Sequence, residues 1–254
     1  MEQSFKSKNA ARETVWREME RQRVAAFPFP PRGRIPNFKG AGAAARRLFD
    51  IPNFAEAKVI KVNPDSAQRP VRAEALRRGI VVYVPTPRLA GGFMKLDPAR
   101  IPLDRIADAT TMSKCAPFAE TMPLRRLPQF DAIVCGSVAV TRGGFRCGKG
   151  AGFADLELAI LAELGQCAVP VATTVHPLQI VGAMPQTATD LPLSYIVTPD
   201  KIFEVAARRA RPRGVDWALL DEAALAAMPV LAELKRLKAG QDRVRRFSSR
   251  PFHA

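Results

Sequence analysis

Runs of β-branched and apolar residues alternate with helical segments through the middle of the chain, and this alternation restricts the possible folds most strongly. Residues 80–84 (IVVYV) form a nearly continuous apolar run, which is typical of a strand buried on both faces of a sheet. We expect strands over 58–63, 80–84, 133–135, 169–174 and 193–197, and helices over 70–78 and 153–164. Such an order favours an α/β fold with a mostly parallel sheet.

The two ends of the chain differ from this central part. We expect a polar helix over 7–26, an extended proline-rich segment over 27–38 and a short alanine-rich helix over 41–49. A terminal helix is expected over 216–237, where Pro229 predicts a kink or break. The pattern therefore predicts one domain over residues 1–238, followed by a basic, flexible C-terminal tail over 239–254.

The charge balance is strongly basic, with 39 Lys and Arg against 24 Asp and Glu and a formal net charge of +15 over 254 residues. The excess is spread along the sequence, although residues 151–200 contain no Lys or Arg. Nucleic-acid-binding proteins usually gather cations on one face and add stacking aromatics, whereas only 7% of residues here are aromatic. A nucleic-acid partner is therefore disfavoured. The charge indicates solvated surface or attraction of a polyanion such as ATP.

Hydropathy and cysteine usage indicate the compartment. No run approaches the roughly 18 apolar residues that a membrane span needs. The first 23 residues show no apolar signal core, and their acidic residues argue against a transit peptide. The four cysteines lack the CxxC spacing of a zinc site and indicate reduced thiols. These features predict a cytoplasmic protein with no membrane segment.

The densest chemical signal lies in residues 141–161 (TRGGFRCGKGAGFADLELAIL), where alternating glycines lead directly into a predicted helix. Glycines let successive backbone N–H groups converge on an anion, and the amino end of a helix adds partial positive charge. The residues concerned are Gly148, Gly150 and Gly152, with Arg142, Arg146 and Lys149 as nearby cations. Phosphate is the natural ligand of such a loop, and Asp155 and Glu157 could hold Mg²⁺ beside it.

The spacing of these glycines matches neither of the two common phosphate-binding motifs. It is GxGxG, rather than the GxGxxG of dinucleotide-binding folds or the GxxxxGK[ST] of the Walker loop. A tight turn before an ordinary acidic helix start is therefore an alternative to a phosphate site.

Four segments in the same order resemble the 5-formyltetrahydrofolate cyclo-ligase (methenyltetrahydrofolate synthetase) family. Residues 131–155 (DAIVCGSVAVTRGGFRCGKGAGFAD) are similar to the family's signature region. Lys8 and Arg12 match a K-x-x-x-R in its first helix, and Pro87-Arg88 followed by Met94 matches a P-R-x-x-x-x-x-M stretch. Residues 188–199 (ATDLPLSYIVTP) resemble a further family segment that carries an aspartate, here Asp190.

The resemblance implies a three-layer α/β/α sheet of the kind shared with ribose-phosphate isomerases and CoA-transferases. It also implies an ATP- and Mg²⁺-dependent enzyme that converts 5-formyltetrahydrofolate into 5,10-methenyltetrahydrofolate through a phosphorylated formyl group. Lys149 and Arg146 would be catalytic, and Asp155 and Asp190 would hold Mg²⁺. The residues implied in nucleotide binding are Lys8, Arg12, Arg146, Gly148, Lys149, Gly150, Gly152 and Phe153. In such sheets ligands bind beyond the carboxyl ends of the strands.

The chain departs from the family pattern where contacts to the pterin ring are expected. Phe153 and Ala154 replace a pair of tyrosines, and Leu156 and Cys135 also differ from the family residues. The family's acidic residue after the first strand is absent, with Asp65 or Gln68 as the only candidates. These differences resemble a divergent branch with a GKGxGFADLE loop.

Two other functions therefore remain open. One is a paralogue that acts on another small formylated or pyrimidine-like substrate, including one related to thiamine. The other is a non-catalytic protein that binds a nucleotide or RNA. The lone His176 follows a predicted strand and could act as an acid or base, but a structural role is the commoner one for such a histidine. The sequence does not define an oligomeric state.

Overall fold

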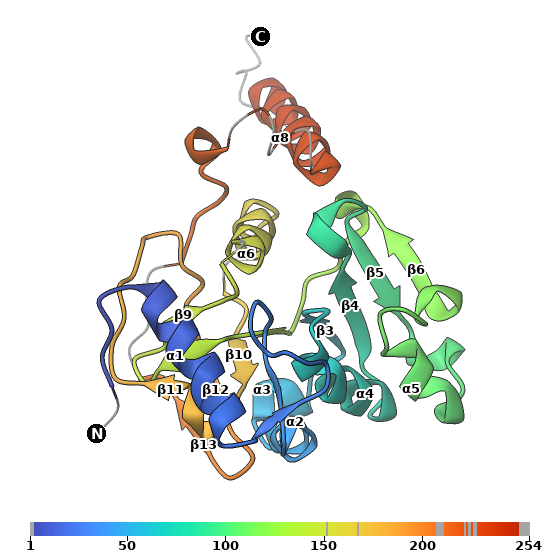
Figure 1. Ribbon diagram of the computed structural model, residues 1–254. Coiled ribbons are helices and arrows are strands. Elements are labelled where there is room, and N and C mark those ends of the chain that lie inside the picture. Colours follow the sequence, from blue (N-terminus) through green and yellow to red (C-terminus); the bar gives the residue numbers. More distant parts are fainter. Residues whose placement is uncertain are drawn as a thin grey trace, which may run out of the picture.

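The computed structural model describes residues 3–248 except 151, 167, 207–210, 221, 223–224 and 226–227. Its centre is an eight-stranded sheet in the order β13-β12-β10-β7-β3-β4-β5-β6 (Figure 1). The strands in that order are Ile202–Glu204, Tyr195–Val197, Val171–Thr174, Ala132–Cys135, Val59–Val62, Val81–Pro85, Phe93–Leu96 and Ala119–Met122. The five strands from β12 to β4 are parallel, and the pairs at both edges are antiparallel. The prediction of a mostly parallel sheet is confirmed.

Helices cover both faces of this sheet, so the fold has the three layers expected. On one face, α2 (Ala41–Leu48), α3 (Pro52–Ala55) and α4 (Arg69–Arg77) bury apolar side chains against the strands, and α5 (Ile106–Ala109) packs beside α4. On the other face lie α6 (Phe153–Glu163) and the first part of α8 (Pro229–Ser248). Successive side chains of β4 point to opposite faces of the sheet. Val82 and Val84 pack against the helices of the first face, and Tyr83 packs on the face of α6. Burial of both faces explains the continuous apolar runs of the central strands.

A second, three-stranded sheet lies beside the main one and carries the N-terminal helix. Its strands, in the order β11-β8-β9, are Ile180–Val181, Ala139–Thr141 and Arg146–Cys147. The helix α1 (Lys8–Arg21) packs on it through buried residues such as Val15 and Met19. The helix ends five residues earlier than predicted, because residues 25–26 form a strand, β1 (Ala25–Ala26), that pairs with β2 (Asn37–Phe38).

Short 3₁₀ turns connect many of these elements. They cover Ser66–Gln68, Pro87–Leu89, Pro98–Arg100, Leu103–Arg105, Ala116–Phe118, Leu124–Arg126, Pro177–Gln179 and Trp217–Leu219. Among the described residues, no helix combines the length and apolar character needed to cross a membrane.

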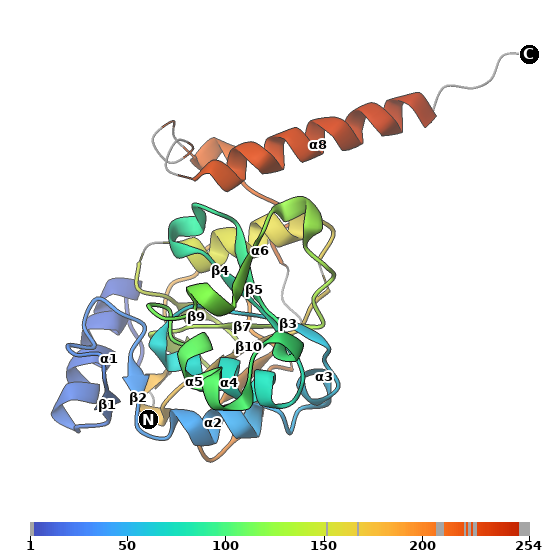
Figure 2. The ribbon, with the colours of Figure 1, turned by 90° about the vertical axis from the view of Figure 1, so that its right-hand side faces the viewer.

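The C-terminal helix differs from the prediction at both ends. The helix α8 begins at Pro229 instead of 216, since proline is favoured in the first turn of a helix and disrupts its interior. It continues to Ser248, so the expected start of a flexible tail at 239 falls inside a helix. Figure 2 shows its later part extending beyond the rest of the fold. Residues 249–254 lie outside the described residues, and the division into one domain and a tail stays a prediction.

Candidate active site

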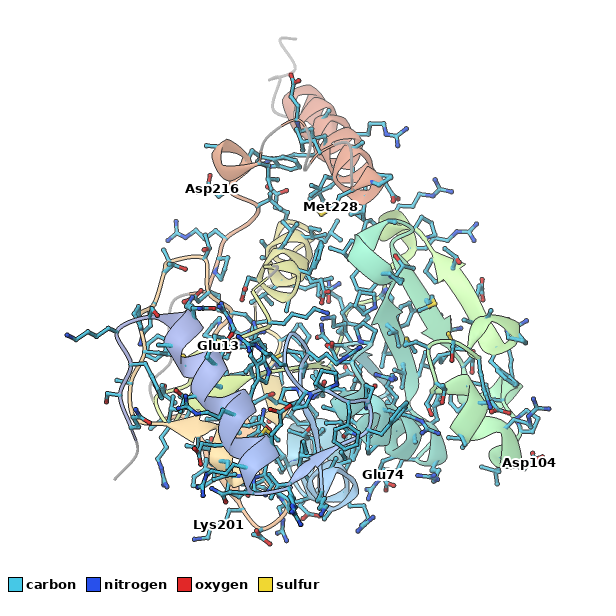
Figure 3. All side chains as sticks on the ribbon, viewed as in Figure 1. Glu13, Glu74, Asp104, Lys201, Asp216 and Met228 are labelled. Carbon is cyan, nitrogen blue, oxygen red and sulfur yellow. The ribbon has the colours of Figure 1, made fainter. Side chains whose placement is uncertain are left out.

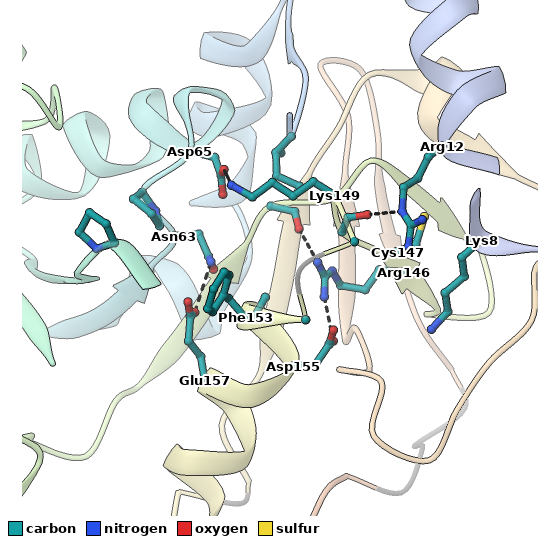
Figure 4. Close-up of a pocket in the computed structure, with 18 of the residues that line it drawn as sticks. Lys8, Arg12, Asn63, Asp65, Arg146, Cys147, Lys149, Phe153, Asp155 and Glu157 are labelled. Carbon is teal, nitrogen blue, oxygen red and sulfur yellow. Dashed lines mark hydrogen bonds and ion pairs between the residues drawn. The ribbon is translucent and has the colours of Figure 1, made fainter. Parts of the chain in front are cut away.

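A cavity of about 620 Å³ opens at the carboxyl ends of β3, β4 and β7, between α1 and α6 (Figure 4). It is lined by residues of α1, of the segments that follow β3, β4 and β7, of β9, and of the glycine loop that leads into α6. Its size lies in the range of small-molecule sites. The position at the strand ends agrees with the sequence-based expectation. The residues that the family resemblance implies in catalysis, nucleotide binding and Mg²⁺ binding all line this cavity except Asp190. Arg142 and His176 do not line it.

The glycine loop adopts the backbone that its sequence predicts. Gly150 and Gly152 have φ angles of 110° and 68°, which L side chains rarely adopt, and Gly152 forms the N-cap of α6. The carbonyl of Gly148 accepts a hydrogen bond from Nε of Arg12 at 2.8 Å. The Arg12 guanidinium lies beside Gly150, where a Cβ atom would sit 3.7 Å from Cζ. The first helix therefore holds the loop with a cation at its surface.

Two of the predicted cations keep charge available to a ligand. The Arg12 guanidinium donates to the neutral acceptors Gly148 and Asn9, and it forms no ion pair among the described residues. The Lys149 side chain is half exposed, and its Nζ lies 3.7 Å from the Asp65 carboxylate. Lys8 also lines the cavity, but its ammonium is paired with Asp190. We call Lys8, Arg12, Gly148, Gly150 and Gly152 the cationic end.

Arg146 also lines the cavity, but its charge is already paired with Asp155. It is only 3% exposed, and its two terminal nitrogens donate to Asp155 and to the carbonyl of Gly136, each at 3.0 Å. Its Nε is buried without a hydrogen-bond partner among the described residues. Because its charge is already paired, Arg146 positions Asp155 and the end of β7, whereas Lys149 and Arg12 point their charge into the cavity.

The two aspartates predicted to hold Mg²⁺ also differ from each other. Asp155 accepts from Arg146 and from the backbone of Leu191 through Oδ1, and its Oδ2 makes no hydrogen bond among the described residues. Oδ1 of Asp190 accepts from Lys8 and from the hydroxyl of Thr187, and Oδ2 accepts from the backbone N–H of Thr187. Asp190 does not line the cavity. The described residues contain no group of three or more metal-ligating side chains. Asp155 therefore fits a cation shared with phosphate oxygens, and Asp190 in its present pairing does not.

Sequence reasoning missed a buried polar cluster at the other end of the cavity. Lys61 on β3 forms an ion pair with Glu157 of α6 and donates to Oδ1 of Asn63 at 2.9 Å. Asn63 in turn donates to Oε2 of Glu157 at 3.3 Å. Burial raises the pKa of Glu157, and the nearby Lys61 opposes that rise. In the sequence, the only sign of this cluster is that Lys61 and Asn63 stand at alternate positions of an apolar strand. Their partner Glu157 is about 95 residues away, so the contact could not be predicted.

Asn63 and Glu157 line the cavity together with Phe153, and Figure 4 places these three opposite Lys8 and Arg12. We call Asn63, Phe153 and Glu157 the aromatic end. Asp65 and Lys149 lie between the two ends in the same view. The cavity thus offers a cationic region and, within reach of it, an aromatic side chain beside buried polar groups.

Residues proposed to replace the family's missing acid lie at the edge of this site. Asp65 lines the cavity, whereas Gln68 is fully buried. A Cβ atom at Gly136 would come within 2.9 Å of Gln68 Oε1 and 3.0 Å of Asp65 Oδ2. A glycine is therefore needed after β7 for this close approach.

His176 has a structural position, as the commoner interpretation of a lone histidine predicted. Its Nδ1 accepts from the backbone N–H of Leu178 at 3.2 Å and caps a 3₁₀ turn outside the cavity. Burial lowers its pKa, and Asp200 partly opposes this shift. Cys115, Cys135 and Cys147 are free thiols, and Cys167 lies outside the described residues.

Comparisons with known proteins agree with the motif resemblance. A model of the 5-formyltetrahydrofolate cyclo-ligase family matches residues 5–199. The chain is 37% identical over 245 residues to a Bos taurus protein and 38% identical over 245 residues to a Mus musculus protein, each named methenyltetrahydrofolate synthase domain-containing protein. The alignments cover 93% of this chain, but only 64% and 66% of those proteins, so the chain spans less than two thirds of their length.

Among solved structures, the chain is similar to that of a 5,10-methenyltetrahydrofolate synthetase from Aquifex aeolicus. The TM-score is 0.49 and the identity 16%, with 80% of this chain and 95% of that chain covered.

Proposed function

The chain belongs to the 5-formyltetrahydrofolate cyclo-ligase family, and from this premise we propose that it cyclises 5-formyltetrahydrofolate to 5,10-methenyltetrahydrofolate with consumption of ATP. The observation that carries the proposal is one cavity in which a cationic glycine loop lies within reach of an aromatic side chain and buried polar groups. Such a cavity suits a polyphosphate at one end and a heterocycle at the other. We expect the reaction to take place in the cytoplasm.

The cationic end supports the placement of the ATP phosphates. Arg12 and Lys149 supply charge that is not tightly paired, and the amino end of α6 adds its partial positive charge. Phosphoryl transfer requires mainly positioning and charge neutralisation from a protein. Lys149 lies between the two ends, and this position suits a cation beside the transferred phosphoryl group.

In the proposed reaction, phosphorylation turns the formyl oxygen, which is a poor leaving group, into part of a phosphate that leaves readily. The formyl oxygen attacks the γ-phosphorus of ATP, so that a new P–O bond forms while the bond to ADP breaks. N10 of the folate then attacks the activated formyl carbon and loses its proton. The C–O bond breaks, and inorganic phosphate leaves with the former formyl oxygen. Binding both reactants in one cavity makes the first step effectively unimolecular.

The family resemblance also implies Mg²⁺, which would neutralise phosphate charge when bound. Among the described residues, Oδ2 of Asp155 fits such an ion, and phosphate oxygens would complete its coordination. Arg146 would orient Asp155 through its hydrogen bond to Oδ1. Lys8 would keep Asp190 in the segment that also positions Leu191 against Asp155.

The proposal is tested by mixing the protein with ATP, Mg²⁺ and 5-formyltetrahydrofolate and following the absorbance of methenyltetrahydrofolate. We expect ATP-dependent product formation, and a loss of about 100-fold in kcat/KM in Lys149→Ala. Lys114→Ala is the matched control, since Lys114 is an exposed lysine that pairs with Asp108 and does not line the cavity. Absence of product at high enzyme concentration would reject the proposal.

A paralogue with another substrate is the second candidate. Ala154 favours it, because it lines the cavity where the family pattern has a tyrosine. Glu157, which is paired with the buried Lys61, adds a carboxylate to the same wall. In that case ATP would bind at the cationic end and 5-formyltetrahydrofolate would not be consumed. A non-catalytic protein would bind nucleotide or RNA without turnover, and RNA binding would weaken steeply with salt.

A further inference from the structure

The buried pair Lys61 and Glu157, together with Asn63, is not needed to hold the ATP phosphates. The three side chains are 1%, 4% and 5% exposed, so the protein has removed two charges from water here. Removing an ion pair from water is costly, and apolar residues of similar volume often stabilise a fold as well or better. A polar cluster retained at the wall of a cavity therefore suggests a role in binding.

The arrangement leaves one acceptor directed at the cavity. Oε2 of Glu157 accepts from both Lys61 and Asn63. Its second oxygen, Oε1, makes no hydrogen bond among the described residues, although Glu157 lines the cavity. Lys61 is paired with this carboxylate and does not line the cavity, so it acts on a ligand only by holding Glu157.

The surroundings of this oxygen are suited to a flat ring. Phe153 lies one helical turn before Glu157 on α6, so both side chains are on the same face of that helix. Pro87 also lines the cavity, from a 3₁₀ turn that packs against α6. An aromatic face beside a carboxylate accepts a planar heterocycle that stacks and donates an N–H group.

We propose that Glu157, positioned by Lys61 and Asn63, is the acceptor by which this protein recognises a ring N–H or amino group of its substrate. The inference rests on the proposed function and deepens it, because it names the residues that select the heterocycle. Lys61 has a specific task in this arrangement. It holds Oε2 of the carboxylate together with Asn63, and this leaves Oε1 to accept a hydrogen bond from the ligand.

The inference is tested by calorimetric titration of the protein with 5-formyltetrahydrofolate, and with pterin as a minimal ring probe, in the absence of ATP. We expect Glu157→Gln to weaken binding of both probes by roughly tenfold or more, while the Kd for ATP changes less than about twofold. The control is Glu163→Gln, on the same helix and likewise paired with a lysine, Lys238, but outside the cavity. This control should bind all three ligands like the unchanged protein.

A second variant covers the possibility that a single substitution unfolds the protein. The double variant Lys61→Met/Glu157→Met replaces the pair with apolar side chains of similar volume, a change that buried pairs often tolerate. We expect it to fold and bind ATP, but to lose affinity for both ring probes. Retained affinity in either folded variant would overturn the inference, and so would failure of the unchanged protein to bind both probes. Normal ring binding without turnover would contradict only the proposed function.

Discussion

At the scale of single residues, the site separates groups that the motif could identify from groups that only the fold brings together. Lys8, Arg12 and Lys149 were predicted because they stand in recognisable motifs, and all three line the cavity. Lys61 and Glu157 could not be paired from the sequence, since they come from different elements of the chain. The pairing of Arg146 with Asp155 was likewise invisible, because a motif gives residue types without the partners that take up their charge.

Side chains pack so closely around Gly136 that adding a single methyl group should destabilise the protein. In Gly136→Ala the new Cβ would collide with Ile35, Gln68 and Asp65, so we expect a loss of about 1–3 kcal/mol in the free energy of unfolding and a large loss of activity. Denaturant unfolding measures the first and the absorbance assay the second. Gly42→Ala in α2 is the control. A Cβ atom there would make only an ordinary contact, 3.7 Å from Nη1 of Arg46, so this substitution should stabilise by about 0.4–1 kcal/mol. Wild-type stability and activity in Gly136→Ala would contradict the geometry.

His176 predicts a pH effect on stability. Burial lowers its pKa below the ordinary value of 6.5, so at pH values near and below 6.5 the unfolded state binds more protons than the folded state. Stability is therefore retained above pH 6.5 and decreases as the pH falls below it. Protonation of Nδ1 would also remove the acceptor for Leu178.

The check is the free energy of unfolding of the unchanged protein and of His176→Asn, measured between pH 7.5 and 5.5. Asparagine keeps an acceptor near the position of Nδ1 but does not titrate, so its pH dependence should be flatter. Identical slopes in the two proteins would refute this assignment.

At the scale of elements, the sequence predicted the buried strands and helices well and the edges poorly. The central strands carry continuous β-branched runs, because both faces are covered, and this pattern is readable. The edge strands β5, β6 and β13 were not predicted, since they are short and partly exposed. The strands of the small sheet were not predicted either, since they are only two or three residues long and depend on partners elsewhere in the chain. The start of α8 was placed too early because the proline was interpreted as a break within a helix.

The first turn of α1 connects element stability to ligand binding. Ser7 caps this helix by accepting from the backbone of Ala10 at 3.1 Å, and the turn carries Lys8 at its start. We expect Ser7→Ala to cost about 1 kcal/mol and to raise the KM for ATP several-fold, because fraying moves Lys8 away from the cavity. Ser7→Thr keeps the capping oxygen and should restore both values. An unchanged KM for ATP in Ser7→Ala would show that the first turn does not position the site.

At the scale of the whole molecule, the +15 charge divides between the site and the surface. Arg12 and Lys149 face the cavity, whereas many other cations form exposed pairs, such as Arg105 with Asp108 and Arg100 with Glu120. Such surface pairs contribute little to stability and mainly keep the surface solvated.

Figure 3 shows labelled charged residues such as Asp104 and Lys201 at the periphery, while the buried Met228 lies where α8 meets the core. The layered architecture was predictable from alternation and burial, but the path of α8 was not.

The central claim is that the two ends of one cavity bring the formyl oxygen to the γ-phosphate. The most direct measurement uses 5-formyltetrahydrofolate labelled with ¹⁸O in the formyl group, and determines by mass spectrometry where the label is found after turnover with ATP. The account predicts that the released inorganic phosphate carries the ¹⁸O. Release of the label into water, or methenyltetrahydrofolate formation without labelled phosphate, would contradict it.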